Sequence, residues 1–142
     1  MKNISRLFFV AILASLLSSC GYNSMVQKRE EVNKAWANVE SAYQRRADLV
    51  PNLVSTVKAA AEFEQTTLTQ VMEARAKATS IQIKADDLNE ENLKKYQQVH
   101  QGLQGALKSL LAVAENYPQL KATQNFADLQ NQLEGTQNRI NK

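Results

Sequence analysis

The sequence predicts an all-α fold: an antiparallel bundle of about four long helices after an N-terminal signal or anchor segment. The 142 residues include only four glycines and two prolines, too few for the many turns of a β protein. Apolar residues recur at steps of three and four over long stretches, which is the spacing of one helix face. Helices with such stripes bury them most simply by packing side by side.

The first 19 residues have the layout of a secretory signal. Two basic residues, Lys2 and Arg6, precede an apolar run over residues 7–17, and two serines separate that run from Cys20. The run has 11 residues, whereas spanning a bilayer takes roughly 20. A retained membrane anchor that takes in residues 4–20 is the alternative.

Residues 17–20, Leu-Ser-Ser-Cys, resemble the bacterial lipobox. The resemblance implies a lipoprotein signal peptide at 1–19 and a mature chain, residues 20–142, that begins with a lipidated Cys20. Each buried CH₂ of an acyl chain contributes roughly 0.8 kcal/mol, so several chains hold a protein firmly on a membrane. An ordinary cleaved signal that happens to contain a cysteine is the alternative.

The charge balance does not favour a nucleic-acid partner. The net charge is +3, and Lys2 and Arg6 account for two of the 17 basic residues. Without them, 15 basic residues face 14 acidic ones, a net charge of +1. Nucleic-acid surfaces need clustered cations and stacking aromatics, and aromatic residues make up only 6% of this chain.

We expect a first helix from about Ser24 to Ala47, capped by Asn23. Pro51 disfavours helical backbone at the residue before it and suits the first turn of a new helix. The sequence therefore predicts a turn at 48–50 and a second helix at about 51–79. One long helix with a kink at the proline is the alternative. The stripe of the first helix is Val32, Trp36, Val39 and Tyr43.

Two further helices follow a loop at residues 80–89. Asn89 is expected to cap the third helix, which ends at Pro118, and Thr123 the fourth, whose pattern is still running at Lys142. Gly102 and Gly105 weaken the third helix and leave room for close contact. The two stripes are Leu93, Tyr96, His100, Leu103, Leu107, Leu110, Ala114 and Tyr117, and then Phe126, Leu129, Leu133, Thr136 and Ile140.

Several runs of the sequence form a specific pattern when they occur together: Tyr22-Asn23, Val32, Ala35-Trp36, Arg45 to Val54 around Pro51, Glu64, Ala74-Arg75, Glu115 to Ala122, Asn125-Phe126, Leu129 and Asn138-Arg139-Ile140. In these runs the chain resembles the LemA family of bacterial envelope proteins. The resemblance implies a helical bundle outside the cytoplasm, attached by an N-terminal membrane segment or lipid. The family has no established catalytic activity, so the resemblance implies no active-site residues. Family members usually continue the last helix further, so the resemblance also indicates a short C-terminus here.

Glu64 and Arg75 are charged residues inside an apolar stripe, so each needs a partner or access to water. With the turn at 48–50, the hairpin would place Glu64 beside Trp36, and Arg75 close to Tyr22 and Asn23. We interpret both as contacts that fix the register of the helices. A groove for an acidic ligand at Arg75 is the alternative.

Arg45 and Arg46 would lie at the hairpin tip. There they would complement the C-terminal dipole of the first helix, or form a docking point for lipid head groups or a partner. His100 is the only histidine and lacks further ligands at metal-binding spacing. We therefore expect a histidine at the core edge, hydrogen-bonded to a neighbouring helix, and no metal site.

These observations favour a lipid-anchored, extracytoplasmic bundle that acts by protein binding or scaffolding in the cell envelope. The expected partners are a membrane, through Cys20, and an envelope protein; we expect no nucleic acid, no cofactor and no enzymatic reaction. The alternative is a bundle that binds an apolar small molecule or lipid between its helices, on the side of Gly102 and Gly105.

Overall fold

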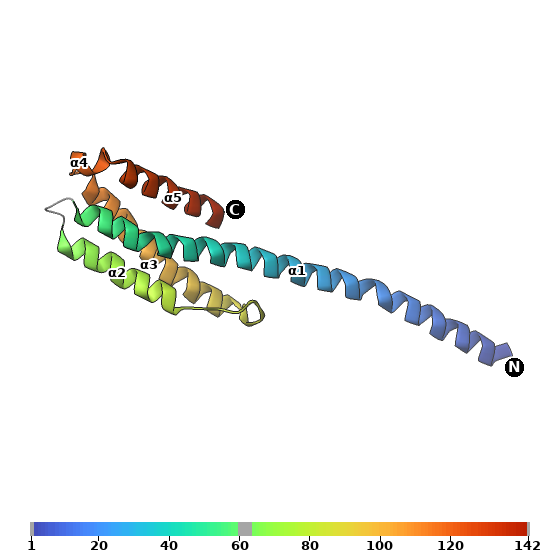
Figure 1. The fold of residues 1–142 in the computed structure, drawn as a ribbon. Helices are drawn as coiled ribbons and strands as arrows, with labels where there is room; N and C mark the ends of the chain where they lie inside the picture. Colours follow the sequence, from blue (N-terminus) through green and yellow to red (C-terminus); the bar gives the residue numbers. More distant parts are fainter. Residues whose placement is uncertain (1, 60–63, 142) are drawn as a thin grey trace. The chain divides into compact units, whose positions relative to one another are not determined.

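The computed structural model describes the backbone of residues 2–59 and 64–141, and the side chains within these ranges from Asn23 onward. Every regular element in these ranges is helical, which confirms the predicted fold class (Figure 1). The elements are α1 (Lys2–Lys58), α2 (Gln65–Ser80), the short 3₁₀ helix η1 (Ala85–Asp87), α3 (Glu90–Ala114), α4 (Pro118–Lys121) and α5 (Gln124–Ile140).

The chain divides into two compact units, residues 1–37 and residues 38–142. The first unit belongs to α1, which begins at Lys2 and passes through Asn23. The expected N-cap at Asn23 is therefore wrong, because one glycine and one asparagine weaken a helix by about 1 kcal/mol each without ending it. The side chains of Cys20 and Tyr22 lie outside the described residues.

Pro51 lies inside α1, so the predicted turn at 48–50 is wrong and the single-helix alternative is correct. The apolar stripe keeps its helical spacing across the proline, and Val50, Leu53 and Val57 are fully buried. Burying each of these side chains contributes roughly 1.5–3 kcal/mol, which together outweighs the ~3 kcal/mol that an interior proline costs.

The position of the hairpin follows from one contact between α1 and α2. The Nε atom of Arg75 donates to the carbonyl oxygen of Ala47 at 2.9 Å. The midpoint of positions 47 and 75 is residue 61, about ten residues beyond the expected turn. The neighbours predicted for Glu64 and Arg75 were derived from a turn at 48–50. Because that turn is wrong, these two predictions are wrong as well.

The core of the second unit is built from the stripes of α1, α2, α3 and α5. The buried apolar side chains include Leu53, Val57, Leu68, Val71, Leu103, Leu107, Leu110, Phe126, Leu129 and Leu133.

Gly102 and Gly105 do not provide the close helix contact that we expected. Both are exposed, and a Cβ atom added to either would meet nothing within 4 Å.

The two predicted caps are confirmed. The side chain of Asn89 accepts from the backbone N–H of Asn92 at 2.8 Å. The hydroxyl of Thr123 accepts from the N–H of Phe126 at 3.4 Å. Both satisfy backbone donors that the first turn of a helix leaves without partners.

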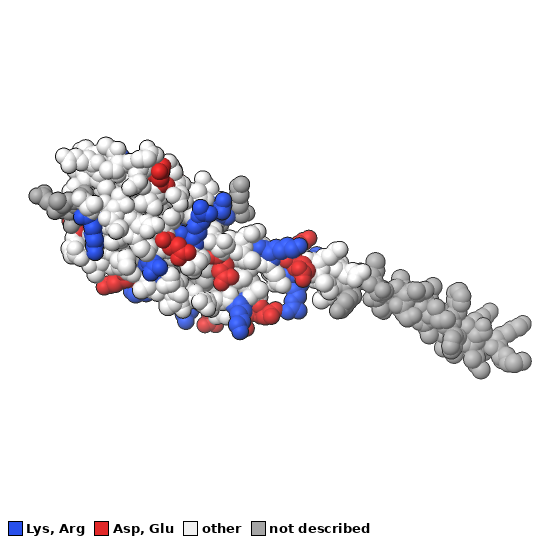
Figure 2. Space-filling view, viewed as in Figure 1, with Lys and Arg blue, Asp and Glu red and all other residues white. Residues whose placement is uncertain are grey.

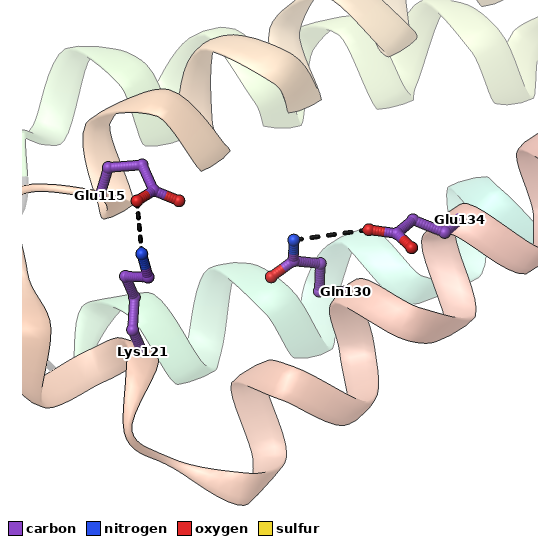
Figure 3. A network of polar contacts seen from close by, with 4 residues as sticks. All are labelled: Glu115, Lys121, Gln130 and Glu134. Carbon is purple, nitrogen blue, oxygen red and sulfur yellow. Dashed lines mark hydrogen bonds and ion pairs between the residues drawn. The ribbon is translucent and has the colours of Figure 1, made fainter.

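A tight corner joins α3 to α5. The third helix ends at Ala114, four residues before Pro118, which instead begins the one-turn helix α4. Lys121 of α4 pairs with Glu115 across this corner, and Gln130 donates to Glu134 on α5 (Figure 3). Both partners of the ion pair are solvent-exposed, so the pair contributes little to stability.

Candidate functional site

A cluster of polar side chains lies inside the second unit, among otherwise apolar layers. We call it the polar layer and define it as Tyr43, Arg46, Tyr96, His100, Thr136 and Gln137. Its members come from α1, α3 and α5. Arg46 and His100 are each 3% exposed and Thr136 is 2% exposed. Such burial is unusual for a charged residue such as Arg46 or a titratable one such as His100. Other contacts must replace the hydration that these side chains lose.

Arg46 ties α1 to α5. Its Nη2 donates to Oε1 of Gln137 at 2.6 Å, and its Nε makes a longer contact of 3.5 Å with Oγ1 of Thr136. The Thr136 hydroxyl donates to the carbonyl of Leu133 at 2.7 Å, which leaves its lone pairs for Arg46. The Gln137 amide donates to Asn141 at 2.8 Å, which turns its oxygen toward the guanidinium.

The buried charge of Arg46 is compensated by dipoles and by an aromatic face. Thr136 and Gln137 belong to the last turns of α5, which ends at Ile140. The C-terminal end of a helix carries partial negative charge and favours a cation. The guanidinium carbon also lies 5.6 Å from the ring centre of Tyr43, within the range of a cation–π contact.

His100 is enclosed by two tyrosine rings. Its ring centre lies 4.2 Å from that of Tyr43 on α1 and 4.3 Å from that of Tyr96 on α3. Neither ring nitrogen has a hydrogen-bond partner among the described residues. The expected hydrogen bond to a neighbouring helix is therefore absent there, and tilted ring contacts with Tyr43 and Tyr96 hold the imidazole instead.

Burial governs the protonation of this layer. Desolvation, aided by the Arg46 charge, lowers the pKa of His100 to about 4. Desolvation raises the pKa of Tyr96 to about 12, with Glu40 and Tyr43 adding to the rise. It also raises the pKa of Tyr43, although the Arg46 charge opposes this. At neutral pH the layer therefore holds one cation, a neutral imidazole and two neutral phenols.

Arg75 and Pro51 form a second arrangement, which the sequence did not connect. In an α-helix the carbonyl of residue 47 would accept the N–H of residue 51, and proline has none. The Nε of Arg75 donates to that Ala47 carbonyl at 2.9 Å. Arg75 thus supplies from α2 the hydrogen bond that Pro51 cannot make within α1.

The remaining predicted residues do not join either arrangement. Arg45 is exposed on α1, so the two neighbouring arginines face different surroundings and neither lies at a hairpin tip. Glu64 is exposed at the start of α2, where its carboxylate accepts from the Thr67 hydroxyl at 3.3 Å. Trp36, in the first unit, is 8% exposed.

The N-terminal part of α1 carries exposed apolar side chains. Met25 is 74% exposed and Val32 is 54% exposed. They are seven residues apart and therefore share one side of the helix. Val26 is 44% exposed but lies about 100° around the helix from Met25. We call Met25 and Val32 the apolar side of α1.

Three of the shallow hollows on the second unit are lined by described residues. One, of about 330 Å³, lies between α1 and α2 and is lined in part by Val54, Leu68 and Met72. The other two are more polar. One follows the loop around η1 and is about 480 Å³, and the other lies between α1 and α5 and is about 410 Å³. The polar layer contributes to none of the three.

Charges of both signs are mixed on the face of the molecule that Figure 2 shows. Within residues 23–59 and 64–141, no three His, Cys, Asp or Glu side chains gather as a metal site. In the part of the chain whose side chains are described, no helix is both long and apolar enough to cross a membrane.

Sequence reasoning missed the polar layer, although its signal was present. Arg46 continues the heptad stripe of α1, at steps of three and four between Tyr43 and Val50. His100 and Thr136 occupy stripe positions of α3 and α5. A polar residue on the stripe of each of three helices indicates that the three residues meet at one level of the bundle. This level can be identified only when the turn between α1 and α2 is placed correctly, because that turn sets the register of the helices.

The comparison with known families supports the resemblance seen in the sequence. The sequence model of the LemA family matches residues 35–142, well over half of the chain. The chain therefore belongs to the LemA family. No curated protein matches it as a relative.

Proposed function

We propose that this member of the LemA family is a lipid-anchored, extracytoplasmic bundle that binds a protein partner in the cell envelope. A lipid on Cys20 would attach it to the membrane. It would act by scaffolding, without a chemical reaction, a cofactor or a nucleic-acid ligand. The membrane and an envelope protein are its proposed partners.

The apolar side of α1 carries this proposal. Exposed side chains such as Met25 and Val32 lose the free energy of burial unless another surface covers them. Along a helix that rises 1.5 Å per residue, Met25 lies about 8 Å and Val32 about 18 Å from Cys20. A partner on this side would meet the bundle close to the proposed anchor. An apolar helix side is a common recognition surface for a second helix.

Site-specific photocrosslinking tests the proposal in cells. A photoreactive amino acid would replace Met25 or Val32 in separate strains. Gln27 and Lys34 are matched controls, since each follows its test residue by two positions, about 200° around the helix, and both are exposed.

We expect one discrete adduct from Met25 and Val32 and little or none from the controls. Equal crosslinking at all four positions, or none at any, would contradict a partner on this side. Mass spectrometry of the adduct would identify the partner.

A second candidate function is binding of an apolar small molecule or lipid, and the hollow between α1 and α2 favours it. Its lining includes Leu68 and the 40% exposed Met72. This hollow lies away from the expected Gly102 and Gly105 side. A fluorescent apolar probe should then bind saturably to the protein and lose affinity in Met72→Glu but not in Met25→Glu. Equal loss in both variants, or no saturation, would exclude it.

A further inference from the structure

The polar layer contains a titratable group in a place where a proton is hard to accommodate. His100 is 97% inaccessible, and neither ring nitrogen has a partner among the described residues. Its ring joins Tyr43 of α1 to Tyr96 of α3, with centre distances of 4.2 and 4.3 Å. A neutral imidazole is held there by its contacts with the two phenol rings, but an imidazolium needs acceptors for two N–H groups.

The charged group that acts on His100 is itself a cation, Arg46. On α1, Arg46 already places a buried positive charge in the layer, while Tyr43 is a neutral phenol. From α5, the uncharged Thr136 and Gln137 direct their oxygens to Arg46. On α2, the Nε of Arg75 donates to the carbonyl oxygen of Ala47, the residue that follows Arg46 in the chain. On α3, Tyr96 is a neutral phenol, and Glu40 of α1 acts on it electrostatically.

We propose that His100 is the proton-sensing residue of an acid-sensitive latch, which opens the contact of α3 with α1 and loosens the end of α5 that Arg46 holds when the imidazole takes up a proton. The protonated ring would repel Arg46 and expose its N–H groups to water. Helices α1 and α2 would stay paired, because the Nε of Arg75 donates to the Ala47 carbonyl in a hydrogen bond in which His100 takes no part. The latch does not depend on the proposed anchor or partner.

The direction of the pH effect follows from the depressed pKa. Folded His100 has a pKa of about 4, against 6.5 in its ordinary state. As the pH falls, the unfolded or opened chain binds the proton first. The stabilising effect of the neutral imidazole is thus fully present above pH 6.5 and is lost progressively between pH 6.5 and 4. Across this window the opening constant should rise by up to about two orders of magnitude.

An NMR titration measures the proton directly. His100 is the only histidine, so the imidazole signals of a histidine-labelled sample report on this residue alone. We expect a midpoint well below 6, and a higher midpoint in Arg46→Met, which removes the neighbouring cation. A midpoint near 6.5 in the wild type, or no change in Arg46→Met, would overturn the proposal.

Hydrogen exchange locates the opening, with rates corrected for the intrinsic effect of pH. Between pH 7.5 and 5 we expect amides around Tyr96 to Leu103 and in the last turns of α5 to lose protection. The amides of α2 should keep their protection from exchange. The His100→Leu variant keeps all carboxylates of the wild type, so the protonation of carboxylates affects both proteins alike. In this variant the pH-dependent loss of protection should disappear. Uniform loss in all helices, or an unchanged loss in His100→Leu, would contradict a latch at His100.

Discussion

At the scale of single residues, adjacent arginines have opposite surroundings. Arg46 is 3% exposed and bonded to α5, whereas Arg45 is exposed on the same helix. Removing Arg46 leaves Thr136 and Gln137 without their partner and opens a cavity. Arg46→Ala should therefore lower the free energy of unfolding by about 2–4 kcal/mol. Urea denaturation followed by circular dichroism measures this change.

Arg45→Ala is the matched control for this comparison. It removes the same side chain from an exposed position, where substitutions usually change stability by less than about 0.5 kcal/mol. Equal losses in the two variants would mean that Arg46 is not buried against α5 in solution.

Pro51, Ala47 and Arg75 form one unit at the same scale. Arg75→Met keeps most of the packing volume but leaves the Ala47 carbonyl without a donor, so it should cost about 1–3 kcal/mol. In Pro51→Ala the backbone N–H of residue 51 becomes available to that carbonyl. Arg75→Met should then cost less than about 1 kcal/mol in the Pro51→Ala background. A double-mutant cycle measured by urea denaturation gives the coupling.

Additivity is the result that would count against this account. If Arg75→Met cost the same with proline or alanine at 51, the Arg75–Ala47 bond would not replace the missing backbone hydrogen bond. Arg45→Met, tested in both backgrounds, controls for a general effect of losing an arginine.

At the scale of elements, the start of α3 depends on one side chain. Asn89 accepts from the N–H of Asn92 at 2.8 Å. Asn89→Ala should reduce the free energy of unfolding by about 1 kcal/mol, and Asn89→Asp should retain most of the stability, because a carboxylate also caps a helix. Thermal unfolding of both variants checks this, and a loss in Asn89→Asp as large as that in Asn89→Ala would refute the cap.

The elements also show where reasoning from sequence succeeds. The caps at Asn89 and Thr123 are local features, and they were predicted correctly. Most positions of the predicted stripes of α3 and α5 are buried, although Leu93 is exposed and Tyr117 lies beyond the end of α3. Pro51 was misread because a local rule was given more weight than the stripe of Val50, Leu53 and Val57, which crosses it without a break. The sequence from Ala59 to Glu64 contains neither glycine nor proline, so nothing local marked the end of α1.

At the scale of the whole molecule, an error in one turn changed every predicted long-range neighbour. Moving the centre of the hairpin from near 50 to near 61 separates Glu64 and Arg75 from the partners that we expected. The later turn also brings Arg75 next to Ala47. In addition, it sets the register of the helices that form the polar layer. Single-sequence periodicity identified most of the buried residues, although Val32 and Leu93 on the predicted stripes are exposed. The pairing of stripes depends on loops that carry little signal.

The proposed function also belongs to this scale. Family membership and the exposed apolar side of α1 support a binding role. The proposed attachment of the bundle to a membrane depends on Cys20 and the residues before it. Whether the chain works at a membrane surface therefore decides which partners are relevant.

The most direct test is metabolic labelling with a palmitate analogue in cells that produce the wild type or Cys20→Ala, together with the intact mass of the mature protein. We predict a labelled wild type that begins at Cys20 and an unlabelled Cys20→Ala variant. An unlabelled wild type that keeps Met1, or one that is cleaved near Cys20 without a lipid, would contradict the lipid-anchored bundle.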